Sequence, residues 1–203
     1  MLHLQALDPD ALGLLRKLQA QPTLSTLRLV GGTSLALQIG HRKSVDLDLF
    51  GNLEATPEEL SQILLAIGRT TTLSTSRSIY VYTINDVKVD LVNYPYEWLE
   101  ASVKGDGIVL AGKPDIAAMK LAAITNRGSK KDFVDLHVLL QEYSLHQMLD
   151  WYERKFPDGS EFLVLRSLSY FEDAEEDEDP VMLGPWSWTE TKATIQEAVR
   201  ECQ

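Results

Sequence analysis

Residues 28–50 constrain the fold more than any other part of the chain, because they combine paired glycines with two closely spaced aspartates. They predict a strand that ends at Gly31-Gly32, a short helix over 35–39, a basic loop, and a second strand that carries Asp46 and Asp48. Paired glycines permit positive φ angles and let the backbone approach a ligand closely. Backbone N–H groups at the start of the helix that follows are suited to binding phosphate.

The two aspartates form a D-x-D pair on the second of these strands. Side chains alternate across a strand, so Asp46 and Asp48 are expected on one face and Val45, Leu47 and Leu49 on the other. Two neighbouring carboxylates repel each other unless a cation lies between them, and oxygen ligands of this kind suit Mg²⁺. Taken singly, however, a Gly-Gly pair is also typical of a plain turn, and a D-x-D pair of a solvated strand face.

The composition favours a soluble globular protein of one domain, or of one domain with a helical appendage. At 203 residues the chain is long enough for a substantial core. Its single cysteine, Cys202, can form no internal disulfide, and no apolar run approaches the roughly 20 residues that span a bilayer. The N-terminus lacks the basic and apolar regions of a signal peptide. We therefore expect a cytoplasmic protein that does not associate with membranes.

The charge is strongly acidic and unevenly distributed. The net charge of −11 argues against broad, nonspecific binding to nucleic acid. Much of it comes from an acidic run over residues 172–179, which we expect to be a solvated loop without a catalytic role. Several basic residues are expected near the glycine turn: Arg42, Lys43, Lys113, Lys120, Arg127, Lys130 and Lys131. A local basic pocket of this kind would suit a nucleoside triphosphate better than a long duplex.

Helical and strand signals can be placed along most of the chain. Helices are expected over residues 8–20, 57–67, 116–125, 130–143, 146–155, 160–170 and 189–202. Expected helix caps are Asp8, Thr33 or Ser34, Thr56 and Ser129. Asn85-Asp86 is expected to form a two-residue turn between strands over 79–84 and 87–92.

Asp90 lies in the second strand of this hairpin. Val87, Val89 and Leu91 are expected on one face of the strand, and Lys88 and Asp90 on the other. Asp90 would then be either one residue of a solvated face or the third carboxylate that the D-x-D pair lacks. Two-metal phosphoryl chemistry needs enough acids to hold two cations about 4 Å apart.

Three further features lie in the second half of the chain, and each has two interpretations. Lys120 flanks an apolar helical stripe, so its ammonium group either extends to water or reaches triphosphate oxygens. Asp132 and Asp135 share one helix face, either as functional acids or because a first helical turn favours acids. The aromatic residues Tyr94, Tyr96 and Trp98 could stack on a base, but we favour packing.

The ordered set of motifs resembles a known enzyme family. Residues 31–37, 40–42 and 44–50 resemble the first motif of the nucleotidyltransferase superfamily with the polymerase-beta-type fold. More narrowly, they look like the AbiEii/AbiGii toxin family of nucleotidyltransferases. Asp90 matches the position of the third carboxylate of such enzymes, and residues 120–136 resemble the family's third and fourth motifs.

This resemblance implies a fold, a domain organisation and a set of site residues. The implied fold is α/β (α+β), with a nucleotidyltransferase core and small mixed sheet over residues 1–112 and a helical region over 113–203. The implied metal ligands for Mg²⁺ are Asp46, Asp48 and Asp90. The implied catalytic set adds Lys120, which would contact phosphate, and Asp132, as base or organiser. The implied substrate-binding residues are Gly31, Gly32, Thr33, Ser34, Arg42, Lys120, Arg127 and Asp135.

The implied function is Mg²⁺-dependent transfer of a nucleoside monophosphate from a nucleoside triphosphate to an acceptor hydroxyl. Members of the family act as toxins of toxin–antitoxin or phage-defence systems, and some modify tRNA. A tRNA acceptor and a cognate antitoxin protein are therefore the implied partners. Two alternatives keep the same fold: a catalytically inactive module that binds nucleotide or protein, and a phosphotransferase that modifies a protein.

Overall fold

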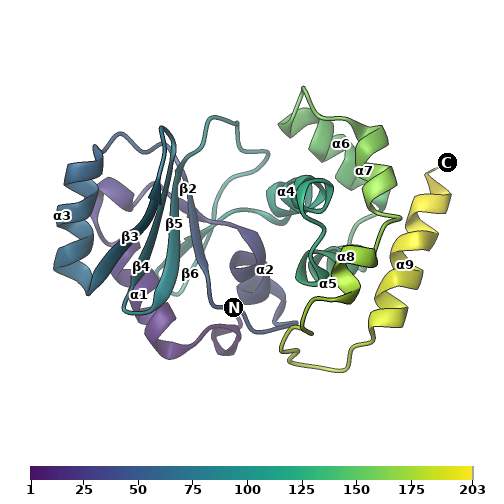
Figure 1. Ribbon diagram of the computed structural model, residues 1–203, viewed down its shortest axis with the longest axis horizontal. Coiled ribbons are helices and arrows are strands. Elements are labelled where there is room, and N and C mark those ends of the chain that lie inside the picture. Colours follow the sequence, from purple (N-terminus) through teal and green to yellow (C-terminus); the bar gives the residue numbers. More distant parts are fainter. Residues whose placement is uncertain (203) are drawn as a thin grey trace. The chain divides into compact units, whose positions relative to one another are not determined.

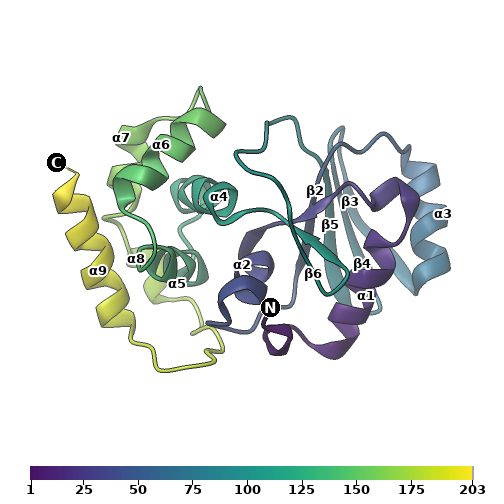
Figure 2. The same cartoon turned by 180° about the vertical axis from the view of Figure 1, so that it is seen from behind.

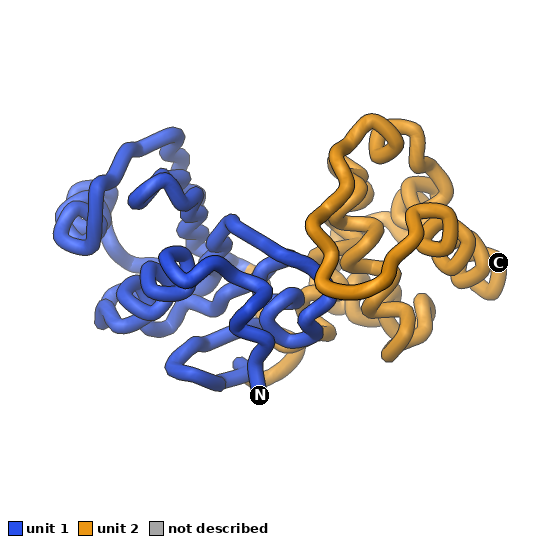
Figure 3. The backbone as a smooth tube through the Cα atoms, turned by 90° about the horizontal axis from the view of Figure 1, so that it is seen from below, with its two compact units in different colours: residues 1–95, 102–111 blue, residues 96–101, 112–203 orange. Residues whose placement is uncertain are grey.

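The computed structural model describes residues 1–202; Gln203, the last residue of the expected helical region, lies outside the described residues. The chain forms two compact units, coloured separately in Figure 3. Unit 1 comprises residues 1–95 and 102–111, and unit 2 comprises residues 96–101 and 112–203. The chain therefore passes from one unit to the other three times, and each unit is considered by itself below.

Unit 1 is built on a seven-stranded mixed sheet, counted over the described residues (Figure 1). Its strands lie in the order β3-β4-β5-β2-β1-β7-β6, with β2–β5 and β1–β7 parallel and the other neighbours antiparallel. The strands are β1 (Arg28–Leu29), β2 (Leu47–Gly51), β3 (Thr70–Thr75), β4 (Ile79–Ile84), β5 (Val87–Asn93), β6 (Val103–Gly105) and β7 (Ile108–Leu110). The helices of unit 1 are η1 (Leu4–Ala6), α1 (Pro9–Gln19), η2 (Pro22–Leu24), α2 (Gly31–Ile39) and α3 (Pro57–Ile67). The expected mixed α/β class is confirmed.

The helices of unit 1 cover the two faces of the sheet unequally. Figures 1 and 2 show α1 and α3 on one face and α2 on the other. Leu47 and Leu49 of β2 and Leu91 of β5 are fully buried in one cluster with the leucines of α1 and α3. Because side chains alternate along a strand, the intervening residues of β2 and β5 project toward the face covered by α2.

Two local signals of unit 1 form as the sequence predicts. Asn85 and Asp86 both have positive φ, 49° and 67°, as a two-residue hairpin turn between antiparallel strands requires. Thr56 caps α3 and forms a capping box with Glu59. Asp8, in contrast, precedes α1 without a side-chain cap.

Unit 2 is predominantly helical in its described part. Its helices are α4 (Lys113–Asn126), α5 (Lys130–Leu139), α6 (Leu145–Lys155), α7 (Glu161–Ser167), α8 (Glu172–Glu175) and α9 (Trp188–Glu201). Helix α4 packs against α5, α6 and α7, and α5 also packs against α9. Helices α5 and α7 end at Leu139 and Ser167, earlier than the sequence predicts. No helix within residues 1–202 combines the length and apolar character needed to cross a bilayer.

The short segment 96–101 is anchored within unit 2 by a buried ion pair. The Nζ atom of Lys155 lies 2.7 Å from Asp115 Oδ1, and both side chains are fully buried. Asp115 accepts hydrogen bonds from the backbone N–H groups of Leu99 and Glu100, and Lys155 donates to the carbonyl oxygen of Glu97. These hydrogen bonds satisfy the charges of Asp115 and Lys155 and hold residues 97–100 in place. We therefore assign the ion pair a structural role.

Candidate active site

Two of the expected metal ligands lie opposite each other on neighbouring strands. In the parallel β2–β5 ladder the Cα atom of Asp48 is the register partner of Asp90. Both residues alternate with buried apolar residues of their strands, so both side chains project on the α2 face. Strand pairing thus brings together carboxylates that are more than forty residues apart in the sequence.

Asp46 belongs to the same electrostatic environment, although it does not lie on the strand. Strand β2 begins only at Leu47, and Val45 is 59% exposed. The prediction that the strand already includes Val45 and Asp46, with Val45 on the face of Leu47 and Leu49, is therefore wrong, because the alternation begins after Asp46. Its charge nevertheless acts on Lys88 together with the charges of Asp48 and Asp90.

Lys88 places its ammonium group among these acids. Its Nζ atom donates to Asp90 Oδ2 at 2.9 Å, and its side chain is 45% exposed. Partial burial lowers the pKa of Lys88, but the hydrogen bond with Asp90 and the charges of Asp90, Asp48 and Asp46 outweigh burial and raise it. The three carboxylates therefore act on one cation, which here belongs to the protein.

The second oxygen of Asp90 is left without a partner. Asp90 Oδ1 is buried and has no hydrogen-bond partner among the described residues. A buried carboxylate oxygen without a donor carries a substantial desolvation cost, so such an atom indicates a position meant for a ligand.

The glycine turn brings backbone next to the Asp48 carboxylate. Gly31 has a φ of +66°, and a Cβ atom there would lie 2.7 Å from Asp48 Oδ2. A side chain at position 31 would thus occupy the space beside the carboxylate and strain the backbone. Helix α2 starts at Gly31 with Val30 as its N-cap residue and no side-chain cap. Its first N–H groups therefore lie beside the acids, as a phosphate site requires.

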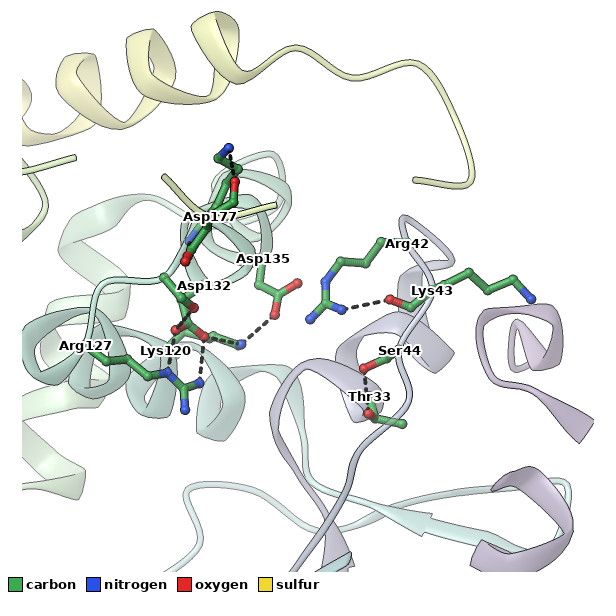
Figure 4. Close-up of polar contacts among 11 residues, drawn as sticks. Thr33, Arg42, Lys43, Ser44, Lys120, Arg127, Asp132, Asp135 and Asp177 are labelled. Carbon is green, nitrogen blue, oxygen red and sulfur yellow. Dashed lines mark hydrogen bonds and ion pairs between the residues drawn. The ribbon is translucent and has the colours of Figure 1, made fainter. Parts of the chain in front are cut away.

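Thr33 and Ser34 do not cap this helix, contrary to expectation. Both lie inside α2 and are buried. Thr33 Oγ1 donates to the carbonyl oxygen of Asp46. It also lies 2.7 Å from Ser44 Oγ, and Figure 4 shows this contact. The threonine hydroxyl thus ties α2 to the loop before β2 and positions the D-x-D pair. Arg42 of the same loop is buried, and its guanidinium donates to the carbonyl oxygen of Lys43.

The residues around Asp48 and Asp90 fit a divalent cation. The donor set is all oxygen, one of its oxygens lacks a donor, and Gly31 keeps the adjacent space clear. Within residues 1–202, no group of three or more His, Cys, Asp and Glu side chains is already drawn together as a metal cage. We refer to Asp46, Asp48, Asp90 and Lys88 as the open cluster.

A second cluster of charges lies in unit 2 between α4 and α5. The Nζ atom of Lys120 lies 2.8 Å from Asp132 Oδ1 and 2.5 Å from Asp135 Oδ2 (Figure 4). The side chains of both aspartates are fully buried, and that of Lys120 is 5% exposed. The interpretation that Lys120 extends to water is therefore wrong. Its ammonium group is enclosed between two acids that its own unit supplies.

Asp132 is further held by the turn that precedes its helix. Arg127 donates to both Asp132 oxygens, and the Ser129 hydroxyl donates to Oδ2 at 2.6 Å. Burial alone would raise the pKa of Asp132, but the charge of Lys120 and hydrogen bonds from Arg127, Lys120 and Ser129 lower it far below its ordinary value. We refer to Lys120, Arg127, Ser129, Asp132 and Asp135 as the closed cluster.

The structure therefore distributes the expected site residues over both units. Gly31, Gly32, Thr33, Ser34, Arg42, Asp46, Asp48 and Asp90 belong to unit 1, and Lys120, Arg127, Asp132 and Asp135 belong to unit 2. The expected aromatic residues pack: Tyr94 on Phe50, Tyr96 on Phe156, and Trp98 beneath the Lys155 ammonium group.

Sequence reasoning missed one residue of the open cluster and one acid near the closed cluster. Lys88 lies two residues before Asp90, and the strand period already places both on one face. Asp177 lies in the acidic run, where nothing in the local sequence separates it from its neighbours. The run itself is not a plain solvated loop, because Glu172–Glu175 form α8 and Asp177 and Asp179 both contact Lys130.

Comparison with known proteins identifies the family of the chain. Residues 13–201 match the family model described as nucleotidyl transferase AbiEii toxin, type IV toxin–antitoxin system. The chain belongs to the AbiEii nucleotidyltransferase toxin family. Membership confirms the expected enzyme class, nucleotidyltransferase, and the general use of a divalent metal by that class.

One curated relative and two solved structures are also similar to this chain. An uncharacterized protein of Aquifex aeolicus is 34% identical over 181 residues, which cover 85% of this chain and 86% of the relative. The JHP933 structure from Helicobacter pylori is 18% identical, with a TM-score of 0.59 over 96% of this chain and 92% of that one. MenT4, a nucleotidyltransferase toxin from Mycobacterium tuberculosis H37Rv, is 17% identical, with a TM-score of 0.57 over 94% of this chain and 80% of the MenT4 chain. At these identities the structures support the fold.

Proposed function

We propose that this member of the family transfers a nucleoside monophosphate from a nucleoside triphosphate to an acceptor hydroxyl, with Mg²⁺ held by Asp46, Asp48 and Asp90. The observation that carries the proposal is the β2–β5 register, which pairs Asp48 with Asp90 beside the Gly31 backbone. A cation bound by these acids would offset the negative charge of the phosphate oxygens during transfer.

The protein's own groups supply binding and orientation. The N–H groups at the start of α2, with Gly31 and Gly32, cradle the phosphates, and Ser34 lies in the same first turns. The acceptor oxygen forms a bond to the α-phosphorus, the bond from that phosphorus to the β-phosphate oxygen breaks, and pyrophosphate leaves. Asp90 has an oxygen without a hydrogen-bond donor, whereas both oxygens of Asp132 accept hydrogen bonds, so Asp90 is better placed than Asp132 to take the proton of the acceptor hydroxyl.

The family resemblance offers two roles for Asp132, base or organiser, and we propose that it is an organiser. Both of its oxygens accept hydrogen bonds, and its lowered pKa makes it a weak proton acceptor. We retain Lys120 as a phosphate contact and Arg127, Asp135 and Arg42 as substrate-binding residues. Single substitutions of these residues, scored for the KM of the nucleotide, test those roles.

We further propose RNA, and tRNA in particular, as the acceptor, and a cognate antitoxin as the physiological partner. The type IV toxin–antitoxin description of the family supports the antitoxin. Isolation of the labelled product after reaction with total RNA identifies the acceptor. Growth arrest on expression, relieved by a neighbouring gene, tests the antitoxin.

The decisive experiment incubates the protein with Mg²⁺, each labelled nucleoside triphosphate and total RNA or cell extract. Wild-type protein should transfer label, and Asp48→Asn and Asp90→Asn should each lower transfer at least about a hundredfold. Asp86→Asn is the matched control, because Asp86 lies in the turn that leads into β5 but is 83% exposed and pairs with Arg69. Absence of both label transfer and nucleotide binding by the wild-type protein contradicts the proposal.

One observation favours a second candidate function, a nucleotide-binding protein without turnover. Lys88 already supplies a positive charge to the carboxylates, so the cluster is partly neutralised without a metal. Calorimetric nucleotide binding that Asp48→Asn abolishes, without transfer to any acceptor, would favour this candidate over the enzyme.

A further inference from the structure

We propose that Asp177 is a positioning residue for Asp132: its carboxylate caps the first N–H of helix α5 and fixes the turn in which Ser129 holds the Asp132 side chain. The proposal rests on the proposed organising role of Asp132. It assigns a specific task to a segment that the sequence alone presents as a solvated acidic loop. All groups involved lie within unit 2.

The first turn of α5 lacks the cap that its sequence appears to provide. Ser129 occupies the N-cap position, where a serine hydroxyl normally accepts a hydrogen bond from a backbone N–H of the first turn. Here the hydroxyl donates instead to Asp132 Oδ2 at 2.6 Å, and Ser129 makes no side-chain cap. The start of α5 therefore needs an acceptor from elsewhere.

Asp177 supplies that acceptor from 47 residues further along the chain. Its Oδ2 atom accepts a hydrogen bond from the backbone N–H of Lys130, the first residue of α5, at 2.8 Å. A carboxylate in this place also complements the partial positive charge of the helix N-terminus. This bond satisfies the first N–H of the helix, a donor that a serine cap, which accepts from the second or third N–H, would not reach.

The segment that carries Asp177 is tied down on both sides of it. We call residues 171–188 the strap. The Lys130 ammonium group donates to the Asp177 carbonyl oxygen, pairs with Asp179 at 3.0 Å, and lies 5.7 Å from the Trp188 ring. The Lys130 side chain is buried, whereas Asp177 and Asp179 remain exposed, so the lysine holds an exposed strap across the start of α5.

The ends of the strap converge on the residue next to Asp132. Phe171, at one end, and Trp188, at the other, place their rings 4.9 and 6.0 Å from the ring of Phe133. Phe133 is fully buried. The strap therefore fixes the first turn of α5 through one polar contact and one aromatic cluster, and Asp132 lies between them in sequence.

Three substitutions in the strap separate capping from charge. Asp177→Ala removes the acceptor, Asp177→Asn retains an oxygen acceptor without the charge, and Glu178→Ala removes a neighbouring exposed acid. We expect amide exchange at Lys130 and Lys131 to be about tenfold faster in Asp177→Ala, and close to wild type in the other two. The ¹³C signal of the Asp132 carboxyl should shift only in Asp177→Ala.

The kinetic readout is a split between kcat and KM. Asp177→Ala should lower kcat about tenfold and leave the KM of the nucleotide within about twofold, because misplacement of an organising group affects the reaction more than binding. Unchanged exchange at Lys130 in Asp177→Ala overturns the proposal, as does faster exchange with an unchanged kcat and Asp132 signal. Equal effects of Asp177→Asn and Asp177→Ala would show that charge, not capping, is responsible, and would also overturn it.

Two provisions keep the test decisive. If Asp177→Ala does not fold, Asp177→Glu replaces it: a side chain longer by one methylene should raise exchange at Lys130, whereas no change overturns the cap. If the wild-type protein transfers no nucleotide, the proposed function fails. The exchange and carboxyl measurements then still decide whether Asp177 positions Asp132.

Discussion

The open and closed clusters contain similar residues but differ in how fully the protein satisfies their charges. In the closed cluster, Lys120 is enclosed between two fully buried aspartates, and each Asp132 oxygen has donors. In the open cluster, Lys88 is 45% exposed, and Asp90 retains one buried oxygen without a donor. A buried polar network with all its hydrogen bonds made stabilises one arrangement of its residues. In an incomplete network the cost of burying an unpaired atom is relieved only when a ligand binds it. The comparison therefore predicts that substitutions in the closed cluster cost mainly folding stability, and that substitutions in the open cluster cost mainly metal binding.

The largest effect should come from removing the only lysine that the closed cluster encloses. We expect Lys120→Met to lower the free energy of unfolding by roughly 3–5 kcal/mol, because Asp132 and Asp135 would remain buried without their shared cation. Urea unfolding measures this loss. Lys113→Met is the matched control on the same helix: its ion pair with Glu142 is partly exposed and should contribute less than about 1 kcal/mol. Similar losses in both variants would break the comparison.

The open cluster should respond in the opposite manner, losing binding rather than stability. We expect Asp90→Asn to weaken Mn²⁺ binding at least about tenfold, equivalent to about 1.4 kcal/mol. The metal-free protein should lose less than about 1 kcal/mol of stability, since Lys88 can turn to water. Electron paramagnetic resonance titration gives the first quantity and urea unfolding the second. A large loss of stability would mean that this cluster too is structural.

The lowered pKa of Asp132 predicts how the closed cluster responds to acid. A carboxyl whose pKa is lower in the folded state adds stability that is complete above its unfolded value near 4 and is lost as the pH falls below that value. Wild-type stability should therefore fall between about pH 4 and pH 2 with a contribution of up to about 1.4 kcal/mol per pH unit. Asp132→Asn should lack this contribution. If unfolding free energy depended on pH in the same way in wild type and Asp132→Asn, the hydrogen bonds assigned to the Asp132 carboxylate would be contradicted.

The smallest effect concerns Lys88, whose ammonium group competes with a metal for the same oxygens. We expect Lys88→Met to strengthen Mn²⁺ binding about threefold, or roughly 0.6 kcal/mol. Lys104→Met, an exposed lysine on β6 of the same sheet, should leave binding unchanged. Weaker metal binding in Lys88→Met would instead mean that the lysine supports the site.

Local signals predicted much of the fold. Alternation along β5 and the Asn85-Asp86 turn placed the hairpin, and the Thr56 capping box placed the start of α3, because each depends on neighbours in sequence. Prediction failed where the hydrogen bonds of a side chain are made with residues that are distant in the sequence. Thr33 does not cap α2, since its hydroxyl is engaged by Ser44 and the Asp46 carbonyl group.

The candidate site shows the same division. The sequence pattern identified Asp48 and Asp90, but only strand order makes them register partners, and pairing between strands forty residues apart has no local signal. The burial of Lys120 was also unpredictable, because a lysine beside an apolar stripe normally reaches water. Asp177 could not be distinguished from six other acids until the contact with Lys130 was known.

The parallel pairing of β2 with β5 also protects the fold against misassembly. If β5 were to slip by a single residue, Lys88 and Asp90 would turn toward the leucine layer under α1 and α3, and two charges would be buried without solvent. The penalty would be far larger than that of exposing a leucine. Asp48, Asp90 and Lys88 therefore also specify the strand register, because burial of their charges would destabilise any pairing shifted by one residue.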